Sequence, residues 1–307
     1  MKILVTGGAG FIGSCLVDYL ISQKHQVTVI DDLSSGKKEY LNLSARFYNI
    51  DIISSEVDSI FLENQFDLVY HLAAQIDVRK SVSDPIFDNK VNVIGALNIL
   101  ENCYKQGVKK LIFASTGGAI YGETEEIPSS ENVLPYPLSP YGIHKLTFEK
   151  YLYYYYQEYN LNYSILRFAN VYGPRQYKGG EAGVIAIFTD RAVNEKPCII
   201  YGDGKQTRDF IFIDDVIEAL YLCSKIDCRG ELNIGTGKET NLWQVIEALQ
   251  QSIAKDIKVE QKPAKLGEQR RSALNTKRAN DVLNWQAKVD LFSGIKKTVD
   301  WAKLNNK

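Results

Sequence analysis

The sequence predicts an α/β protein with a Rossmann-type doubly wound parallel sheet and a smaller C-terminal α/β substrate domain. The expected strands are short apolar stretches, at residues 2–6, 26–31, 67–72, 110–115 and 163–168. The expected helices are longer amphipathic stretches, at residues 11–23, 87–106 and 141–159. This alternation is typical of a parallel sheet that is covered by helices on both faces.

The turn after the first expected strand has the spacing Gly7-x-x-Gly10-x-x-Gly13. Gly7 permits a tight turn, Gly10 lets the backbone approach a pyrophosphate, and Gly13 lets the helix pack close to the strand. The amides at the start of the helix then face the phosphates. Asp31 ends the second expected strand, where a carboxylate binds ribose hydroxyls and repels a 2′-phosphate. The pattern predicts NAD rather than NADP.

Bulk composition indicates a protein without a polyanionic partner. The 307 residues carry 36 Lys and Arg against 37 Asp and Glu, which leaves a net charge of −1 and no sign of binding to nucleic acid or a membrane surface. No apolar run is long enough to span a bilayer, and the N-terminus is a strand rather than a signal peptide. Five unpatterned cysteines indicate reduced thiols, so we expect a cytoplasmic protein. Three scattered histidines predict no metal site.

The residue pattern of the sequence changes after Asn170. Residues 171–175 break the alternation of strands and helices, and 176–183 are rich in glycine and charge. We expect an NAD-binding domain over 1–170, to which 211–235 return as one more helix and strand. The second domain would then comprise 171–210 and 236–307.

Tyr141 and Lys145 open the third expected helix, after a proline-rich loop. Residues four apart lie on one helix face, so the lysine ammonium is expected to lower the pKa of the tyrosine toward neutrality. A tyrosine shifted in this way can act as an acid or base. The Ser115-Thr116 pair ends a strand, and either hydroxyl could bond the reacting oxygen, with Thr116 preferred. His144 is expected to face solvent, although its imidazole could instead perturb the phenol.

These motifs together resemble the extended short-chain dehydrogenase/reductase family, specifically its nucleotide-sugar 4-epimerases of the UDP-glucose/UDP-N-acetylglucosamine type. The matching stretches run over nearly the whole chain: Thr6-Gly-Gly-Ala-Gly-Phe-Ile-Gly-Ser14, Asp31-Asp-Leu-Ser-Ser-Gly36, His71-Leu-Ala-Ala74, Asn92-Val-Ile-Gly95, Ser115 to Gly122, Tyr141 to Lys145, Arg167 to Arg175, Tyr201-Gly-Asp-Gly204 with Arg208-Asp209, Asn233-Ile-Gly-Thr-Gly237 and Gly267-Glu-Gln-Arg-Arg-Ser272.

The resemblance implies an NAD site and a role for each matching position. Residues implied to hold the pyrophosphate are Gly7, Gly10, Phe11, Ile12 and Gly13. Those implied around the adenosine are Asp31, Asp32, Ser35, Gly36, Asp51 and Ile52. Those implied along the rest of the cofactor are Leu72, Ala73, Ala74, Asn92, Tyr141, Lys145 and Phe168.

The resemblance also implies a UDP-sugar substrate in carbohydrate metabolism or polysaccharide biosynthesis. Residues implied to bind it are Thr116, Tyr141, Asn170, Arg208, Arg270 and Ser272. In the implied reaction Tyr141 removes the proton of the sugar 4-hydroxyl while C4 gives a hydride to NAD. The 4-keto sugar then turns, and the hydride returns to its other face. The resemblance implies that position 272 gates the sugar pocket, where a small residue such as Ser272 leaves room for a 2-acetamido group. We therefore expect UDP-N-acetylglucosamine to be accepted beside UDP-glucose.

The family resemblance further implies a homodimer through helices 87–106 and 141–159, with a stripe formed by Leu152, Tyr155, Tyr156 and Tyr159. Two other functions stay open at this point. A 4,6-dehydratase, decarboxylase or 4-ketoreductase uses the same fold, but the first two need an acidic residue where Gly117 and Gly118 stand. A protein that binds NAD without catalysis would not need Tyr141 and Lys145.

Overall fold

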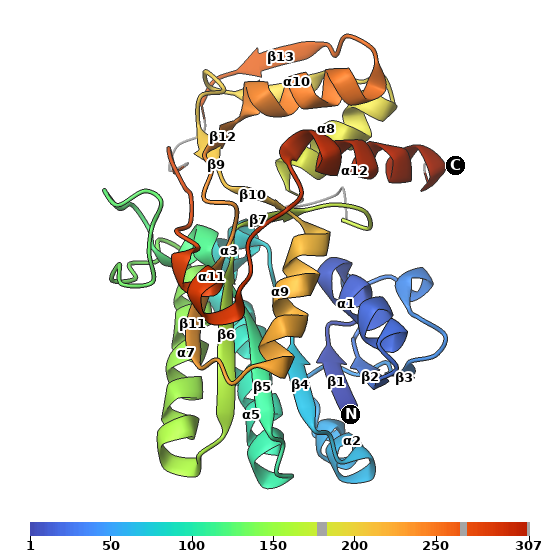
Figure 1. The fold of residues 1–307 in the computed structure, drawn as a ribbon, viewed down its shortest axis with the longest axis vertical. Coiled ribbons are helices and arrows are strands. Elements are labelled where there is room, and N and C mark those ends of the chain that lie inside the picture. The colour runs from blue at the N-terminus through green and yellow to red at the C-terminus, as the bar shows by residue number, and fades with distance from the viewer. Residues whose placement is uncertain (177–182, 265–268, 306–307) are drawn as a thin grey trace.

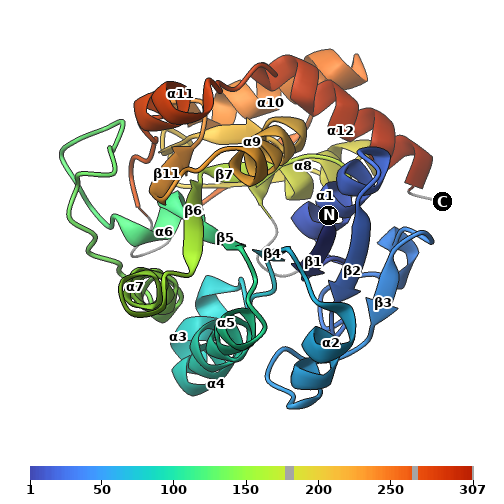
Figure 2. The ribbon, with the colours of Figure 1, turned by 60° about the horizontal axis from the view of Figure 1, so that its bottom comes forward.

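The computed structural model describes residues 1–176, 183–264 and 269–305. Its centre is a seven-stranded parallel sheet in the order β11-β6-β5-β4-β1-β2-β3 (Figures 1 and 2). The strands are β1 (Lys2–Thr6), β2 (Gln26–Ile30), β3 (Arg46–Tyr48), β4 (Leu68–His71), β5 (Lys110–Thr116), β6 (Asn162–Phe168) and β11 (Gly230–Ile234). The predicted fold class is confirmed, and all five expected strands are present.

Helices cover both faces of the sheet because successive strand side chains point to opposite sides. In β1, Ile3 and Val5 join one core while Leu4 joins the other. The first core is covered by α1 (Phe11–Ser22) and α9 (Ile213–Lys225). The second is covered by α2 (Glu56–Asn64), α5 (Ala96–Lys105) and α7 (Pro140–Tyr159). Figure 2 shows these two layers on either side of the sheet.

A smaller layer lies beyond the carboxyl ends of the strands (Figure 1). It contains α8 (Val184–Val193), α10 (Leu242–Ile253) and α12 (Leu291–Asn305), with a parallel pair of β8 (Cys198–Tyr201) and β13 (Val259–Lys262). The elements between the layers are β7 (Asn170–Tyr172), β9 (Thr207–Arg208), β10 (Phe210–Phe212), β12 (Thr240–Asn241) and α11 (Lys277–Leu283). Strand β7 pairs with β10, and β9 pairs with β12.

The chain crosses between the two layers more than once. After α8 and β8 in the upper layer, the chain returns through α9 to β11, which pairs in parallel with β6 at the edge of the main sheet. The helix expected at 87–106 is also divided: α4 (Pro85–Asn89) passes into a π-helical segment, Lys90–Gly95, before α5 begins. Such π-helical turns are rare and often accompany functional sites.

The expectation that Leu152, Tyr155, Tyr156 and Tyr159 form a stripe available for a dimer contact is partly wrong. Leu152 and Tyr155 are buried in the chain's own core, because α7 packs this side against β5, β6 and α5. Tyr159 remains exposed at the end of the helix. In the part of the chain that the structure describes, no helix has the length and apolarity needed to cross a membrane.

Candidate active site

The turn between β1 and α1 is tight, and its glycines make this possible. Gly7 has φ +71°, and its N–H donates to Ile30 O at 2.8 Å. A Cβ on Gly13 would lie 2.0 Å from Gly7 O. A Cβ on Gly10, in contrast, would meet only Gly7 O, at 3.2 Å, within 4 Å. The N-terminus of α1 is therefore left open, where its first amides have no partner within the helix and an anion can bind.

The Asp31 carboxylate is held just behind this turn. Its Oδ2 accepts from Ala9 N at 2.9 Å, and its Oδ1 accepts from Leu33 N at 2.8 Å. Burial raises the pKa of Asp31, while the two amide donors lower it. A Cβ on Gly36 would lie 2.8 Å from Asp31 Oδ1, so glycine is required there. Each oxygen keeps a further lone pair for a ligand hydroxyl.

Other residues expected around the adenosine make local contacts. Asp32 Oδ1 accepts from the N–H and the hydroxyl of Ser34, the neighbour of Ser35 in this loop. Asp51 is exposed, and its Oδ1 accepts from Ile53 N at 2.9 Å. Ile52 is buried. These side chains shape the loops that follow β2 and β3.

The loop after β4 is positioned by polar side chains. Leu72 N donates to Thr6 O, and Ala73 N donates to Thr6 Oγ1 at 3.2 Å. One residue beyond Ala74, the main chain of Gln75 is held by Asn92, which accepts from Gln75 N at 3.0 Å and donates to Gln75 O at 2.9 Å. Asn92 lies in the π-helical segment and acts on this loop.

Tyr141 and Lys145 lie on one face of α7, in its first two turns. Lys145 is buried, its Nζ donates to Ala114 O at 3.0 Å, and it lies 5.9 Å from the centre of the Tyr141 ring. Burial lowers the pKa of Lys145 to about 8, although Asp88 and Glu149 act in the opposite direction. This lysine can therefore change its charge near neutral pH.

The expected lowering of the Tyr141 pKa is wrong for this structure. Burial raises the pKa of Tyr141, the charge of Asp88 raises it further, and a hydrogen bond with Thr116 lowers it. The ammonium of Lys145 is directed at a main-chain carbonyl instead. Sequence spacing places the two groups on one face but cannot anticipate a carboxylate that comes from another helix.

The structure separates the two candidate hydroxyls at the end of β5. Thr116 accepts from Ala119 N at 3.2 Å, capping α6 (Gly117–Ile120), and its hydroxyl lies close enough to Tyr141 to lower the pKa of that phenol. Ser115 points to the opposite side, as the next residue along a strand must, and donates to Glu149 Oε1 at 2.6 Å. The geometry therefore brings Thr116, and not Ser115, to Tyr141.

A buried polar network behind the site was missed by the sequence analysis. Arg167 forms two hydrogen bonds with the Glu149 carboxylate, at 3.0 and 2.5 Å, and donates to Tyr121 OH at 3.0 Å. Tyr121 OH in turn donates to Asn233 Oδ1 at 2.7 Å. The network joins β5, α7, β6 and β11. An arginine inside the apolar strand 162–168 was the available signal, since a buried charge needs a partner.

His144 was expected to face solvent, and this is wrong. Its side chain is only 13% exposed, and Nδ1 lies 2.5 Å from Asp88 Oδ2. The Asp88 side chain is fully buried, and its other oxygen accepts from Gln75 Nε2 at 2.6 Å. Helix α7 packs against α3 (Val78–Ser83) and α4, so the side of α7 that carries His144 faces them rather than water.

The residues expected to bind substrate lie at the boundary between the two layers. Asn170 N donates to Asp209 O at 2.8 Å, and Arg208 Nη1 donates to Thr207 O at 2.8 Å. Arg270 forms a two-bond ion pair with Asp203, at 3.0 and 2.8 Å, yet its side chain is 60% exposed. Ser272 is buried, as is Phe168 at the end of β6. Of the predicted 267–272 stretch, Gly267 and Glu268 lie outside the described residues.

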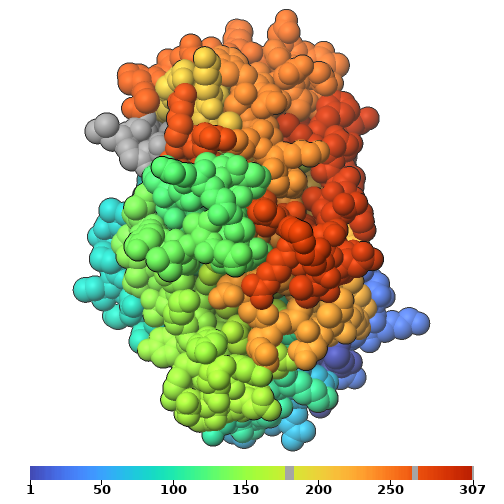
Figure 3. Space-filling model, turned by 60° about the vertical axis from the view of Figure 1, so that its left-hand side comes forward, coloured from blue at the N-terminus to red at the C-terminus, as the bar shows by residue number. Residues whose placement is uncertain are grey.

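The segment that carries Ser272 is hydrogen-bonded to the loop between α6 and α7. Ser129 N donates to Ala273 O at 2.9 Å, and Asn275 N donates back to Ser129 O at 2.9 Å. Figure 3 shows the two segments, green and orange-red, side by side on one face. The buried Asp209 also holds this segment, because its carboxylate accepts from Leu274 N and from the N–H groups of Thr236 and Gly237. Sequence reasoning had not given Asp209 this role.

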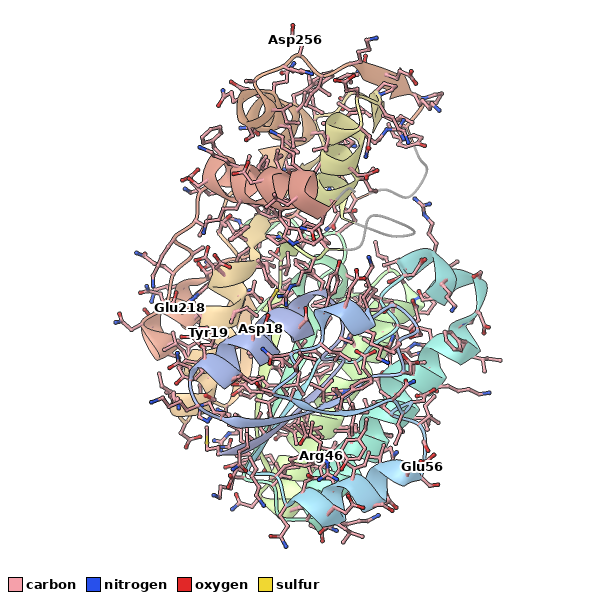
Figure 4. All side chains as sticks on the ribbon, turned by 90° about the vertical axis from the view of Figure 1, so that its right-hand side faces the viewer. Asp18, Tyr19, Arg46, Glu56, Glu218 and Asp256 are labelled. Atoms are coloured by element: carbon pink, nitrogen blue, oxygen red, sulfur yellow. The ribbon has the colours of Figure 1, made fainter. Side chains whose placement is uncertain are left out.

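A cavity of about 550 Å³ lies elsewhere, between α1 and α9. Its lining includes Asp18, Tyr19 and Glu218, which Figure 4 shows on adjoining helices, together with Cys15, Asp214 and Ile217. No predicted site residue lines it. Its three carboxylates are already paired, with Arg175, Lys297 and Lys288. The candidate active site is therefore the edge formed by the carboxyl ends of the strands.

Comparison with known proteins agrees with this geometry. The model of the NAD dependent epimerase/dehydratase family matches residues 3–235. A UDP-glucose 4-epimerase of Mycolicibacterium smegmatis is 41% identical over 98% of each chain. The structure of a Thermotoga maritima UDP-glucose 4-epimerase with UDP-glucose is 46% identical, with a TM-score of 0.98 over 100% of each chain. A Thermus thermophilus UDP-glucose 4-epimerase in complex with NAD is 41% identical, with a TM-score of 0.93 over 98% of each chain.

Proposed function

Because the chain belongs to the NAD dependent epimerase/dehydratase family, we propose that it is an NAD-dependent UDP-sugar 4-epimerase that interconverts UDP-glucose and UDP-galactose. The observation that carries the proposal is the placement of Tyr141, Thr116 and Lys145 together at the carboxyl end of β5. The relatives that are 41–46% identical are UDP-glucose 4-epimerases.

The β1–α1 turn fits a dinucleotide. Gly10 leaves space in front of the helix N-terminus, and the Asp31 carboxylate stands at the end of the adjacent strand. Gly7, Gly10, Phe11, Ile12 and Gly13 would hold the pyrophosphate through backbone amides, and Asp31 would hold the ribose. NAD, when bound, supplies the acceptor and donor of the C4 hydride and a positive charge in its oxidised form.

The chain's own residues supply proton transfer and orientation. Tyr141 takes the proton of the sugar 4-hydroxyl and returns it, and Thr116 hydrogen-bonds the same oxygen. Lys145 provides a buried cation on the same face of α7. The positive charge that oxidised NAD would bring to the site lowers the pKa of a phenol such as Tyr141. Arg208 and Arg270 bind the diphosphate, so that the substrate stays anchored while the sugar turns. Arg270 must then exchange its exposed partner, Asp203, for phosphate.

A dehydratase or decarboxylase is disfavoured by the two glycines after Thr116. A Cβ on Gly117 would lie 2.4 Å from Leu274 Cδ1, so an acidic side chain does not fit there. Gly118 has nothing within 4 Å of its added Cβ and carries no acid. The site thus lacks, at both positions, the carboxylate that such reactions need.

We also propose the domain boundaries, the oligomeric state and the cellular location of the protein. Residues 1–170 and 211–235 form the NAD-binding domain, and 171–210 and 236–307 form the domain that binds the nucleotide sugar. A homodimer forms through helices 87–106 and 141–159, for which the exposed, mutually packed rings of Tyr104, Tyr154 and Tyr159 offer a surface. The protein works in the cytoplasm, and its product serves polysaccharide synthesis.

The deciding experiment incubates the purified protein and NAD with UDP-galactose and follows products by ion-pair chromatography. We expect UDP-glucose to form without net NADH, and Tyr141→Phe to lower the rate by at least about a hundredfold. A stable 4-keto-6-deoxy or decarboxylated product would assign another reaction to the site. No product from UDP-galactose, in a protein shown to bind NAD, would reject catalysis of this type.

A further inference from the structure

A second polar cluster is buried at the other end of β5, remote from the active site. Lys110 is the first residue of the strand and is only 8% exposed. Its Nζ donates to Cys223 O at 2.7 Å and to Ile226 O at 3.0 Å, and it lies 3.6 Å from Cys228 Sγ. Thr116 ends the same strand, about 20 Å away at the rise of an extended chain.

The charge of Lys110 has no carboxylate partner among the ion pairs found in the described ranges. The nearest carboxylate in sequence to the two cysteines, Asp227, accepts instead from Asn162 Nδ2 at 2.8 Å. Burying an ammonium without a counter-ion is costly. Its three N–H donors are directed at two carbonyls and one sulfur, so a thiolate on Cys228 is the anion that completes the site.

The surroundings of Cys228 favour that thiolate. Its sulfur is 3.3 Å from Ser164 Oγ, 3.6 Å from Lys110 Nζ and 3.9 Å from the carbonyl oxygen of Cys223. The neighbouring Cys223 thiol, followed by Ser164 and the charge of Lys110, lowers the pKa of Cys228 against the effect of burial. Burial instead raises the pKa of Cys15 and of Cys198 to about 11, and it raises the pKa of Cys103.

We propose that Cys228 is a nucleophilic thiolate paired with Lys110, and that Cys223 is its partner in a disulfide that forms with hydroperoxides. The Cys228 thiolate attacks the terminal oxygen of the hydroperoxide and breaks the O–O bond, which gives a sulfenic acid and releases hydroxide from hydrogen peroxide or an alkoxide from an alkyl hydroperoxide. The Cys223 thiol then attacks that sulfur, the S–S bond forms, and water leaves. The two thiols lose two electrons, and the peroxide gains them. Cys223 and Cys228 thus form a modification site that is independent of the epimerase reaction.

The first test alkylates the native protein with a limiting amount of iodoacetamide at pH 7 and maps the label by peptide mass spectrometry. We expect Cys228 to be labelled before Cys15, although Cys15 is the more exposed of the two. Lys110→Arg, which keeps the charge, should retain the preference, and Lys110→Met should lose it. Label on Cys15 first in the wild-type protein would overturn the proposal.

The second test treats the protein with hydrogen peroxide and digests it with trypsin, which cuts after Lys225 between the two cysteines. We expect two peptides joined by a disulfide that a reductant separates, and in Cys223→Ser a sulfenic acid on Cys228 that dimedone traps. Cys228→Ser should lose both signals and keep its epimerase rate, because it lies outside the active site. Oxidation distributed equally over all five cysteines would contradict the assignment.

Discussion

His144 Nδ1 lies 2.5 Å from Asp88 Oδ2, and this contact joins the start of α7 to a carboxylate that has no exposed surface. Asp88 is also hydrogen-bonded to Gln75. Its charge raises the pKa of both Tyr141 and Lys145. The pair therefore sets the electrostatic environment of Tyr141, to which we assign proton transfer, and of the neighbouring Lys145.

Removing the charge of Asp88 should make Tyr141 more acidic. In Asp88→Asn the side chain keeps its shape, but the negative charge that favours the protonated phenol is gone. We expect the limb of the kcat–pH profile that reflects Tyr141 deprotonation to move to lower pH, and the rate on the acid side to rise by up to about tenfold. The shift is measured from the kcat–pH profiles of the wild type and Asp88→Asn with UDP-galactose as substrate. A shift to higher pH with an unchanged Tm would refute this reading.

Replacing His144 should act through Asp88. In His144→Ser the carboxylate of Asp88 loses one of its two partners and keeps only Gln75. Its charge then acts more strongly on Tyr141, and the same limb moves to higher pH. In the Asp88→Asn background the His144→Ser change should leave the limb in place, since there is no charge left to shield. Equal shifts in both backgrounds would show that His144 acts on α7 packing alone. Thermal unfolding of all four proteins provides the structural control.

The buried imidazole of His71 should make the fold sensitive to acid. Burial, followed by the charge of Lys145, lowers the pKa of His71 to about 3 from the usual 6.5. Between these values the unfolded chain binds a proton that the folded chain does not, so stability falls as pH falls from about 6.5 toward 3. We expect a loss on the order of 1–2 kcal/mol at pH 5 relative to pH 7.

The control for that prediction is His71→Asn, which can still hydrogen-bond Thr6 Oγ1 but cannot titrate. Urea unfolding at pH 5 and 7 should give a smaller difference for this variant than for the wild type. The same difference in both proteins would assign the acid sensitivity to other groups.

The Glu149–Arg167 pair should be essential to stability. Both side chains are buried, and Ser115 donates to the same carboxylate. Breaking a buried pair leaves one charge without compensation, which costs about 3–5 kcal/mol. We expect Arg167→Met to lower the unfolding free energy by that amount, and Arg167→Met with Glu149→Gln to lose less than the sum of the single changes. Additive losses would show that the pair is not coupled.

The sequence was sufficient to predict the strands and residue pairs that depend on spacing along the chain. The runs that became β1, β2, β4, β5 and β6 are apolar and long enough to recognise, whereas β3 has only three residues, none of them fully buried. Tyr141 and Lys145 are four residues apart on one helix. Asp88 and His144 are 56 residues apart, and Ser115 and Glu149 are 34 apart. Only the packing of α7 on α4 and β5 brings these pairs together, so no periodicity could reveal them.

The size of residue 272 should decide whether a 2-acetamido sugar is accepted. Ser272 is small and buried, in the segment that is hydrogen-bonded to Ser129 in the loop between α6 and α7. In Ser272→Tyr the phenol would fill the space that we assign to the acetamido group, so turnover of UDP-N-acetylglucosamine should fall by at least about a hundredfold while that of UDP-glucose changes less than about threefold. Ser272→Ala is the matched control and should keep both activities. If the wild-type protein turns over UDP-glucose but never the acetylated sugar, the proposed role of Ser272 is wrong even though the epimerase assignment stands.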